Sequence, residues 1–340
     1  MSRFDQLGKS LRSEPRHWLV TGAAGFIGSH LVQSLLTLGQ RVTGLDNFAT
    51  GSRANVAVLK SLPHADAFFT FVEGDICSAS DCARAAKGVD YVLHQAALGS
   101  VPRSIDDPIA SHAANVSGFV NMILASRDAS VKRFVYASSS AVYGDIEDSP
   151  KVEDRVGTLL SPYAVTKKVN ELYAENFSSL YPISSVGLRY FNVYGPRQDP
   201  NGAYAAVIPR WIGELLAGGT CTMNGDGETT RDFCFVDNVV QANILAAVVG
   251  PGVATHRVYN VAVGDTTSLN QLYQMIRDAL AVHRPEVAGR PPTYGPFRTG
   301  DVRHSLANIS RVSDELGYQP SVRVSTGISA TVESYLRSHA

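Results

Sequence analysis

The chain has 340 residues, of which 44% are hydrophobic and 18% are charged, a composition typical of a soluble globular protein with one large or two ordinary domains. The net charge of -1 excludes the basic field that binding to nucleic acid or to an anionic membrane requires. No apolar run approaches the ~18 residues of a membrane-spanning helix. The N-terminus lacks an apolar stretch of signal-peptide length, so the expected location is the cytoplasm.

The four cysteines, Cys77, Cys82, Cys221 and Cys234, have neither zinc-ligand spacing nor a Cys-x-x-Cys pattern. We therefore expect free, mostly buried thiols in a reducing compartment, and no metal site.

A glycine-rich run follows the first predicted strand. Trp18–Thr21 is the strand, and residues 22–28 read Gly-Ala-Ala-Gly-Phe-Ile-Gly. A helical pattern over 29–38 and a second strand over 41–45 follow, and Asp46 ends this unit. A strand, a glycine loop, a helix, a strand and an acid in this order predict a dinucleotide-binding unit, although glycines alone would also suit a tight helix–strand junction.

The chemistry of this unit favours NAD. Glycines let the backbone approach a pyrophosphate, and the helix N-terminus supplies free N–H groups. Asp46 stands where a carboxylate accepts from the adenosine ribose hydroxyls and repels a 2′-phosphate. Arg53 is close by in the sequence, and an arginine there would suit a 2′-phosphate, so NADP stays an alternative.

Strands and helices continue to alternate along the first half of the chain. We expect strands at 68–72, 90–94 and 133–137, and helices at 80–86 and 108–129. This order predicts an α/β fold with a doubly wound parallel sheet, whose ligands bind at the carboxyl ends of the strands.

Polar residues that follow these strands should line one crevice: Asp46, Asp75, Gln95–Ala97, Ser138–Ser140 and Tyr190–Asn192. We interpret His94, at the end of a strand, as a packed side chain and not as an acid or base.

Tyr163 and Lys167 stand four residues apart, so on a helix they share one face. A neighbouring ammonium favours the phenolate, and a bound nicotinamide cation would favour it further. The pair is then able to take a proton from a substrate hydroxyl near neutral pH. The pattern is also common on ordinary amphipathic helices, and the dinucleotide unit upstream favours the catalytic interpretation.

The chain resembles the extended short-chain dehydrogenase/reductase family, and within it the UDP-hexose 4-epimerases. The motifs that carry the resemblance are Thr21–Gly28, Asp46-Asn-Phe48 with Thr50-Gly51, Gly74-Asp-Ile76, His94–Ala97, Ser138–Gly144, Tyr163–Lys167, Arg189–Gly195, Asn224–Gly227, Arg231-Asp-Phe233 and Gly300-Asp301.

The resemblance implies a Rossmann-like NAD-binding domain over 1–193 and a smaller C-terminal α/β domain over 194–340 that binds the UDP-sugar. Residues 233–262 are expected to pack back on the first domain. In the second domain we expect a helix at 207–217, a strand at 220–224, a helix at 238–249, a surface loop at 284–297 and mixed helical and strand pieces at 310–338.

The resemblance also implies the mechanism. Tyr163 would be the base and acid at the sugar O4, Lys167 would bind the nicotinamide ribose, and Ser139, with Ser140 as the second candidate, would bond O4. NAD would stay tightly bound, take a hydride from C4 and return it after the 4-ketosugar has turned over. The 4,6-dehydratases carry Thr-Asp-Glu where this chain has Ser139-Ser140-Ala141, so water loss has no evident catalyst.

The implied cofactor contacts are Gly22, Gly25, Phe26, Ile27, Gly28, Asp46, Asn47, Asp75, Ile76, Gln95, Ala96, Ala97, Tyr163, Lys167, Tyr190 and Val193. The implied substrate contacts are Gly99, Ser100, Ser139, Ser140, Tyr163, Asn192, Ala206, Val207, Trp211, Asn224, Arg231, Arg298, Asp301 and Ser305.

Among the latter, Asn192, Arg231 and Arg298 would hold the diphosphate, and Asp301 the uridine ribose. A bulky tyrosine at the position of Ser305 restricts members of the family to plain hexoses. Serine there implies UDP-N-acetylglucosamine and UDP-N-acetylgalactosamine as the substrate pair. Plain UDP-hexoses and an N-acetylhexosaminuronate stay open, the latter with Arg103 or Arg303 as the cation near C6.

Apolar faces on helices 108–129 and 161–180 resemble the dimer contact of the family, although burial within one chain would explain them equally well. The resemblance implies a homodimer. It also implies that the protein supplies precursors of surface polysaccharides in the cell. The non-enzyme alternatives are a binding module for UDP-sugars and a redox-sensing NAD-binding regulator.

Overall fold

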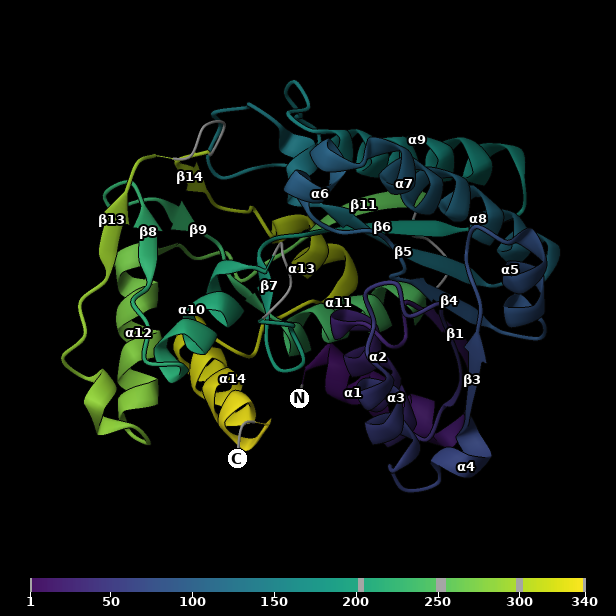
Figure 1. The fold of residues 1–340 in the computed structure, drawn as a ribbon. Coiled ribbons are helices and arrows are strands. Elements are labelled where there is room, and N and C mark those ends of the chain that lie inside the picture. Colours follow the sequence, from purple (N-terminus) through teal and green to yellow (C-terminus); the bar gives the residue numbers. More distant parts are fainter. Residues whose placement is uncertain (1, 201–204, 249–254, 298–301, 339–340) are drawn as a thin grey trace.

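The structure is a computed structural model that describes residues 2–200, 205–248, 255–297 and 302–338. Its centre is a sheet of seven strands in the order β11-β6-β5-β4-β1-β2-β3. Every neighbouring pair in this sheet is parallel. The predicted doubly wound parallel sheet is therefore confirmed (Figure 1). The strands are β1 (His17–Thr21), β2 (Arg41–Asp46), β3 (Phe69–Glu73), β4 (Tyr91–His94), β5 (Arg133–Ser139), β6 (Ser185–Tyr190) and β11 (His256–Val261).

Helices cover both faces of the sheet. In Figure 1, α2 and α11 lie below the sheet and α8 and α9 lie above it. Successive strand residues point to opposite layers, so Trp18 and Val20 join the lower core while Leu19 joins the upper one. The helices of this part are α1 (Arg3–Ser13), α2 (Phe26–Thr37), α3 (Arg53–Lys60), α4 (Ala65–Phe68), α5 (Ala79–Ala86), α6 (Val101–Asp106), α7 (Pro108–His112), α8 (Gly118–Asp128), α9 (Pro162–Leu180), α11 (Val236–Val248) and α13 (Ser310–Leu316).

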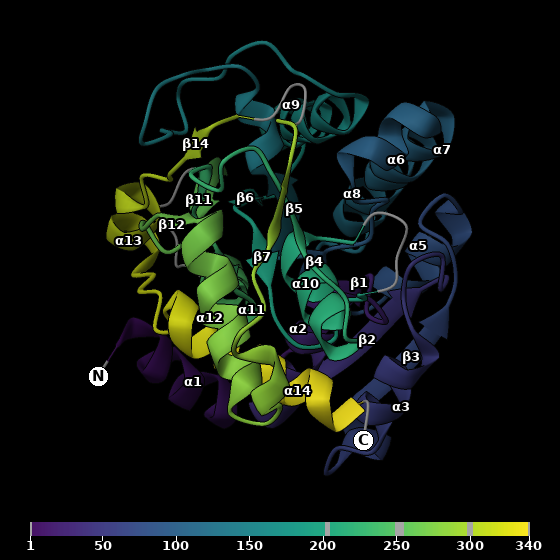
Figure 2. The same cartoon turned by 60° about the vertical axis from the view of Figure 1, so that its left-hand side comes forward.

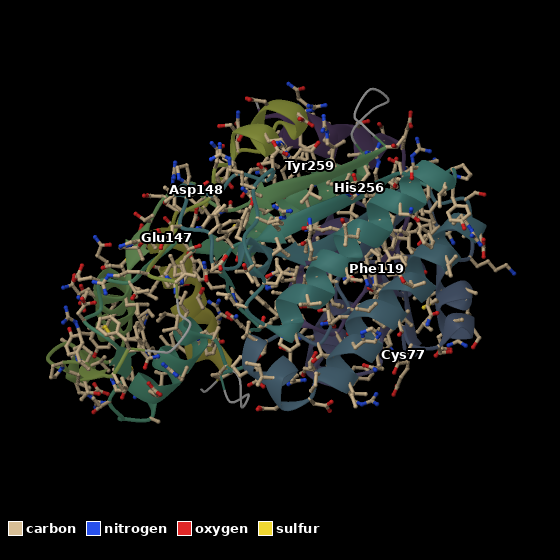
Figure 3. All side chains as sticks on the ribbon, turned by 90° about the horizontal axis from the view of Figure 1, so that it is seen from above. Cys77, Phe119, Glu147, Asp148, His256 and Tyr259 are labelled. Atoms are coloured by element: carbon tan, nitrogen blue, oxygen red, sulfur yellow. The ribbon has the colours of Figure 1, made fainter. Side chains whose placement is uncertain are left out.

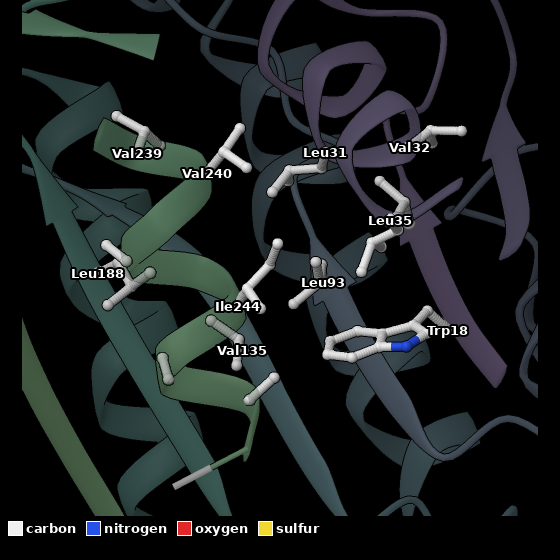
Figure 4. Close-up of a cluster of buried hydrophobic side chains, with 14 of the residues drawn as sticks. Trp18, Leu31, Val32, Leu35, Leu93, Val135, Leu188, Val239, Val240 and Ile244 are labelled. Atoms are coloured by element: carbon white, nitrogen blue, oxygen red, sulfur yellow. The ribbon is translucent and has the colours of Figure 1, made fainter. Parts of the chain in front are cut away.

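The two cores are apolar and closely packed. Figure 4 shows the lower one, where Leu31 and Leu35 of α2 meet Ile244 of α11 over the sheet. Figure 3 looks down on the upper layer, where Phe119 of α8 packs edge-on against Phe134 and Tyr136 of β5. Cys82, Cys221 and Cys234 are buried and Cys77 is exposed, all four as free thiols.

The predicted helix over 108–129 is present with one irregularity. Between α7 and α8 the chain makes a π-helical turn, Ala113–Ser117. Such wide turns occur often at functional sites. This turn carries Asn115. Its Oδ1 accepts a hydrogen bond from the Leu98 N–H at 2.7 Å, and its Nδ2 donates to the Leu98 carbonyl at 3.0 Å.

The C-terminal part has its own core around Trp211 and Tyr273. Figure 2 turns this part forward, with α10, α12 and α14 close together. Its small sheets have the orders β12-β9-β14 and β13-β8. The elements of this part are α10 (Val207–Leu216), β8 (Thr222–Asn224), β9 (Thr230–Arg231), β12 (Thr267–Ser268), α12 (Leu269–Ala281), a 3-10 helix (Pro285–Val287), β13 (Thr293–Gly295), β14 (His304–Ser305) and α14 (Val324–Ser338). The paired strands β7 (Val193–Tyr194) and β10 (Cys234–Phe235) join the two parts.

Two expectations for this region were wrong. The segment 284–297 is not a plain surface loop, because β13 pairs in parallel with β8. Between 310 and 338 the described elements are both helices, α13 and α14. In the described ranges, no helix is long and apolar enough to cross a membrane.

The lower core gives a direct test of packing. Ile244 is fully buried, so Ile244→Ala should lower the free energy of unfolding by about 2 to 5 kcal/mol, through lost burial and the cavity that remains. Urea unfolding followed by circular dichroism measures this. The exposed control Val282→Ala should change it by less than about 0.5 kcal/mol. Equal effects of the two substitutions would contradict the packing.

Candidate active site

A cavity of about 610 Å³ opens at the carboxyl edge of the central sheet. Residues that follow β1, β2, β3, β4 and β6 line it, together with the end of β5 and the first turns of α2 and α9. All the residues that we predicted as cofactor contacts, from Gly22 to Val193, are in this lining. The topology thus brings the predicted set together, while the role of each side chain stays a prediction.

The glycine run makes a cradle without side chains. Gly22 has φ +70°, and a Cβ on Gly28 would lie 2.0 Å from the Gly22 oxygen, so only glycine allows this close approach of α2 to the loop. Helix α2 begins at Phe26 without a side-chain cap and without an acidic residue in its first turn. Its free N–H groups therefore face the cavity and suit a pyrophosphate.

Asp46 is held rigidly at the end of β2. Its carboxylate accepts hydrogen bonds from the backbone N–H groups of Ala24 at 3.0 Å and Phe48 at 2.7 Å. Burial raises its pKa, and these two bonds oppose the rise. Arg53 is bonded to both carboxylate oxygens of Glu73, at 2.9 and 3.2 Å, and its guanidinium lies 4.1 Å above the Phe48 ring.

Gln95 and Tyr190 bond each other across the sheet edge. The Tyr190 hydroxyl donates to Gln95 Oε1 at 3.0 Å, and Gln95 Nε2 donates to Asn243 Oδ1 at 3.1 Å. Asn243 also donates to the Tyr190 oxygen at 2.8 Å. This closed set of bonds fixes one wall of the cavity.

Helix α9 starts at the cavity for local reasons. Ser161 caps it by accepting from the Ala164 N–H, and Pro162 occupies the first helical position. The backbone N–H of Tyr163 donates to Ser104 Oγ of α6 at 2.9 Å. Tyr163 is half-buried and Lys167 is buried, and both line the cavity as one face of the helix.

Burial acts on both side chains of this pair. Lys167 Nζ donates to the Ala137 carbonyl at 2.8 Å and lies 5.9 Å from the centre of the Tyr163 ring. Burial lowers the pKa of Lys167 to about 8. Burial raises the pKa of Tyr163, and a hydrogen bond with Ser139 lowers it in part.

The three serines at the end of β5 and directly after it have different places. Ser139 lines the cavity, whereas Ser140 begins the 3-10 helix Ser140–Tyr143 and is absent from the described lining. Ser138 also lines the cavity, and its hydroxyl donates to Glu171 at 2.7 Å. His94 is packed as predicted, since its ring stacks on Phe134 and bonds the Thr21 hydroxyl at 2.8 Å.

The predicted substrate residues divide into groups. Gly99 lines the cavity, and its neighbour Ser100 caps α6. Asn192 has φ +31° and donates to the Asp232 carbonyl at 3.1 Å, which links the segment after β6 to the residue that follows β9. Arg231 and Ser305 are paired residues of β9 and β14.

The remaining predicted substrate residues are not among the residues that line the cavity, and two of them lie outside the described residues. Trp211 is only 1% exposed and packs edge-on against Tyr273, so its role is in the core of the C-terminal part and not at an open surface. Ala206 and Val207 begin α10, and Asn224 is exposed at the end of β8. Arg298 and Asp301 lie outside the described residues.

Sequence reasoning missed several residues that shape the cavity. Asn115, Ser104 and Asn243 act through hydrogen bonds to distant segments, for which a single sequence carries no signal. Glu171 had a signal, since it continues the four-residue spacing of Tyr163 and Lys167. The other lining residues that we did not predict are Leu45, Ala49, Thr50, Gly74, Cys77, Leu98, Ala110, Ala113, Ala114 and Ala137.

Comparisons with known proteins agree with this geometry. The model of the NAD dependent epimerase/dehydratase family matches residues 18–262. The UDP-glucose 4-epimerase of Mycolicibacterium smegmatis is 41% identical over 319 residues, which cover 93% of this chain and 97% of that protein. The structure of a UDP-N-acetylglucosamine 4-epimerase from Methanobrevibacter ruminantium, in complex with UDP-N-acetylmuramic acid, has a TM-score of 0.87 at 35% identity and covers 95% of this chain and 99% of that one.

The structure of the UDP-glucose 4-epimerase of Thermus thermophilus in complex with NAD has a TM-score of 0.80 at 33% identity, over 94% of this chain and 99% of that one. NAD, the predicted cofactor, is thus confirmed at the level of the family. The chain belongs to the NAD dependent epimerase/dehydratase family, in which its relatives include UDP-sugar 4-epimerases.

Proposed function

We propose that the protein is an NAD-dependent UDP-sugar 4-epimerase whose preferred substrates are UDP-N-acetylglucosamine and UDP-N-acetylgalactosamine. The observation that supports this most is the shared lining of one cavity by Tyr163, Lys167, Ser139 and the whole predicted dinucleotide set. A nucleotide-binding regulator would need the cradle but not a half-buried tyrosine and a buried lysine at its end.

The residues of the cavity fit NAD. The uncapped start of α2 would hold the pyrophosphate, and Asp46 keeps free lone pairs that would accept from the adenosine ribose hydroxyls. Arg53 supports NAD over NADP, because Glu73 already binds its guanidinium. Lys167 would hold the nicotinamide ribose.

When bound, NAD would accept a hydride from C4 of the sugar and return it to the other face, so the reaction needs no external oxidant. Tyr163 would take the proton of the 4-hydroxyl as the ketone forms and give it back when the hydride returns. The Ser139 hydroxyl, which lines the same cavity as Tyr163, would hold the reacting oxygen in line. A nicotinamide cation near Tyr163 would offset the effect of burial on the phenolate.

The sugar-nucleotide would extend toward the C-terminal part. Arg231 is a guanidinium suited to the diphosphate, and Asn192 would contact the same group. Ser305, paired with Arg231, would face the substituent at C2 and leave room for an N-acetyl group. A uronate would need a further cation near C6, and Arg303 already forms an ion pair with Asp226 at 2.6 Å, which supports a neutral C6 group.

We also propose a homodimer. Val165 and Leu172 of α9 and Ile109 of α7 are exposed apolar side chains, at 46%, 53% and 81% exposure, and α7 lies beside α9. A second copy of the chain would cover this face.

The first prediction concerns activity. Purified protein without added NAD should convert UDP-N-acetylglucosamine to UDP-N-acetylgalactosamine, and UDP-glucose to UDP-galactose more slowly, as measured by chromatography. Tyr163→Phe keeps the ring but removes the proton carrier, so the rate should fall by about a hundredfold to ten-thousandfold. Binding of UDP-sugar without any product, even with NAD added, would instead indicate a binding module.

The second prediction concerns Ser305. A tyrosine at this position should lower kcat/KM for the N-acetylated substrate by about tenfold or more and leave UDP-glucose nearly unaffected, because the added ring fills the space beside C2. The ratio of the two kcat/KM values is the measurement. An equal loss for both substrates would contradict the assignment of Ser305 to the C2 subsite.

The third prediction concerns assembly. Sedimentation equilibrium should give twice the mass of one chain, and Leu172→Arg should shift this to a single chain because a charge is costly in a buried contact. The control Val58→Arg, at an exposed apolar position of α3, should leave the mass unchanged. A monomeric parent protein would refute the dimer.

A further inference from the structure

Helix α9 is bonded to the end of β5 at two successive turns. Tyr163, in the first turn of the helix, lines the same cavity as Ser139. One turn later, Lys167 Nζ donates to the Ala137 carbonyl at 2.8 Å. One turn later again, Glu171 Oε1 accepts from the Ser138 hydroxyl at 2.7 Å. These bonds define the register of the helix along the strand.

Among these side chains of α9, Glu171 has several hydrogen-bond partners. Its two carboxylate oxygens accept from Nε and Nη2 of Arg189, both at 2.8 Å, and each side chain is only 3% exposed. Arg189 is on β6, where it is the register partner of Ser138. A bidentate carboxylate–guanidinium pair fixes direction as well as distance.

Arg189 is itself held from its other side. Its Nη1 donates to the Glu153 carbonyl at 2.9 Å, and its guanidinium lies 4.9 Å from the Tyr143 ring centre. The Glu153 carboxylate accepts from the Asn260 N–H at 2.9 Å. Glu171 is therefore attached to a rigid frame made of β5, β6 and β11.

We propose that Glu171, clamped by Arg189, is a positioning residue of the epimerase reaction, which fixes α9 against β5 so that the Tyr163 hydroxyl meets Ser139 at the reacting oxygen. This inference rests on the proposed function. Apolar contacts alone tolerate small slides of a helix, and a displacement of about 1 Å at the reacting groups costs about a hundredfold in rate. A buried ion pair is otherwise weak evidence for stability, since apolar residues can replace it without loss.

The test compares three variants of the full-length protein with the parent. Glu171→Gln keeps the shape but removes the charge that holds Arg189. Glu171→Leu combined with Arg189→Met replaces the pair by apolar side chains of similar volume, which should restore thermal stability but not the register. Glu175→Gln, an exposed position one turn later on α9, is the control.

We expect kcat to fall at least about tenfold in Glu171→Gln and in the double variant, with KM changed by less than about twofold and NAD content unchanged. The ascending limb of the kcat–pH profile should move to higher pH. Without a well-placed Ser139 hydroxyl, burial alone acts on the pKa of Tyr163 and raises it. Lys167 faces Tyr163 from its own helix, with Nζ 5.9 Å from the ring centre. Helix α6, which carries Arg103 and Asp106, bonds the Tyr163 backbone through Ser104.

Two outcomes would overturn the inference alone: kcat and its pH profile unchanged in Glu171→Gln, or both restored in the double variant together with thermal stability. The latter would show that the pair serves folding only. A parent protein without epimerase activity on any UDP-sugar would overturn the proposed function, and with it the part of Glu171 in that reaction.

Discussion

All seven strands of the central sheet run in one direction, and the site depends on this constraint. Because the strands are parallel, their carboxyl ends meet at one edge, and the helices that follow them start there. Helix α2 begins at Phe26, directly after the loop that follows β1, and α9 begins at Pro162 on the other face of the sheet. A phosphate-binding helix terminus and a tyrosine–lysine pair thereby reach the same cavity.

The cavity is costly to build from the protein alone. Lys167 is buried and donates to one carbonyl, and burial lowers its pKa to about 8. Burial also raises the pKa of Tyr163. In the proposed function a bound nicotinamide cation would favour the Tyr163 phenolate, and hydroxyls of the nicotinamide ribose would accept from Lys167. A site that is completed by its cofactor is consistent with NAD that remains bound through each cycle.

The residues on the cofactor side of the cavity are held by several hydrogen bonds, whereas those on the expected substrate side lie on short strands, and this difference suits epimerisation. On the cofactor side, Asp46, Gln95 and Tyr190 are each held by several hydrogen bonds, and Glu171 with Arg189 attaches α9 to two strands. On the substrate side, Arg231 and Ser305 are on a sheet of three short strands. In the proposed function, firm anchors for the nucleotides would leave the sugar free to turn over between the two hydride transfers.

Much of the site was predictable because the relevant physics is local. The glycine run, Asp46 and the Tyr163–Lys167 spacing require only the geometry of one turn or one helix, and their neighbours in sequence carry the signal. Other features depended on contacts between distant segments. Trp211 is in a core formed with α12, β13 pairs with β8, and Ser140 turns away into a 3-10 helix.

The amino-acid sequence by itself therefore determined the sheet, the order of its elements and the dinucleotide cradle, because hydrophobic period and loop chemistry act over a few residues. Only the tertiary structure decided the bonding partners of α9. Lys167 donates to the Ala137 carbonyl, and Glu171 accepts from Arg189 and from Ser138. These partners come from different strands, and their choice follows from the packing of α9 on the sheet.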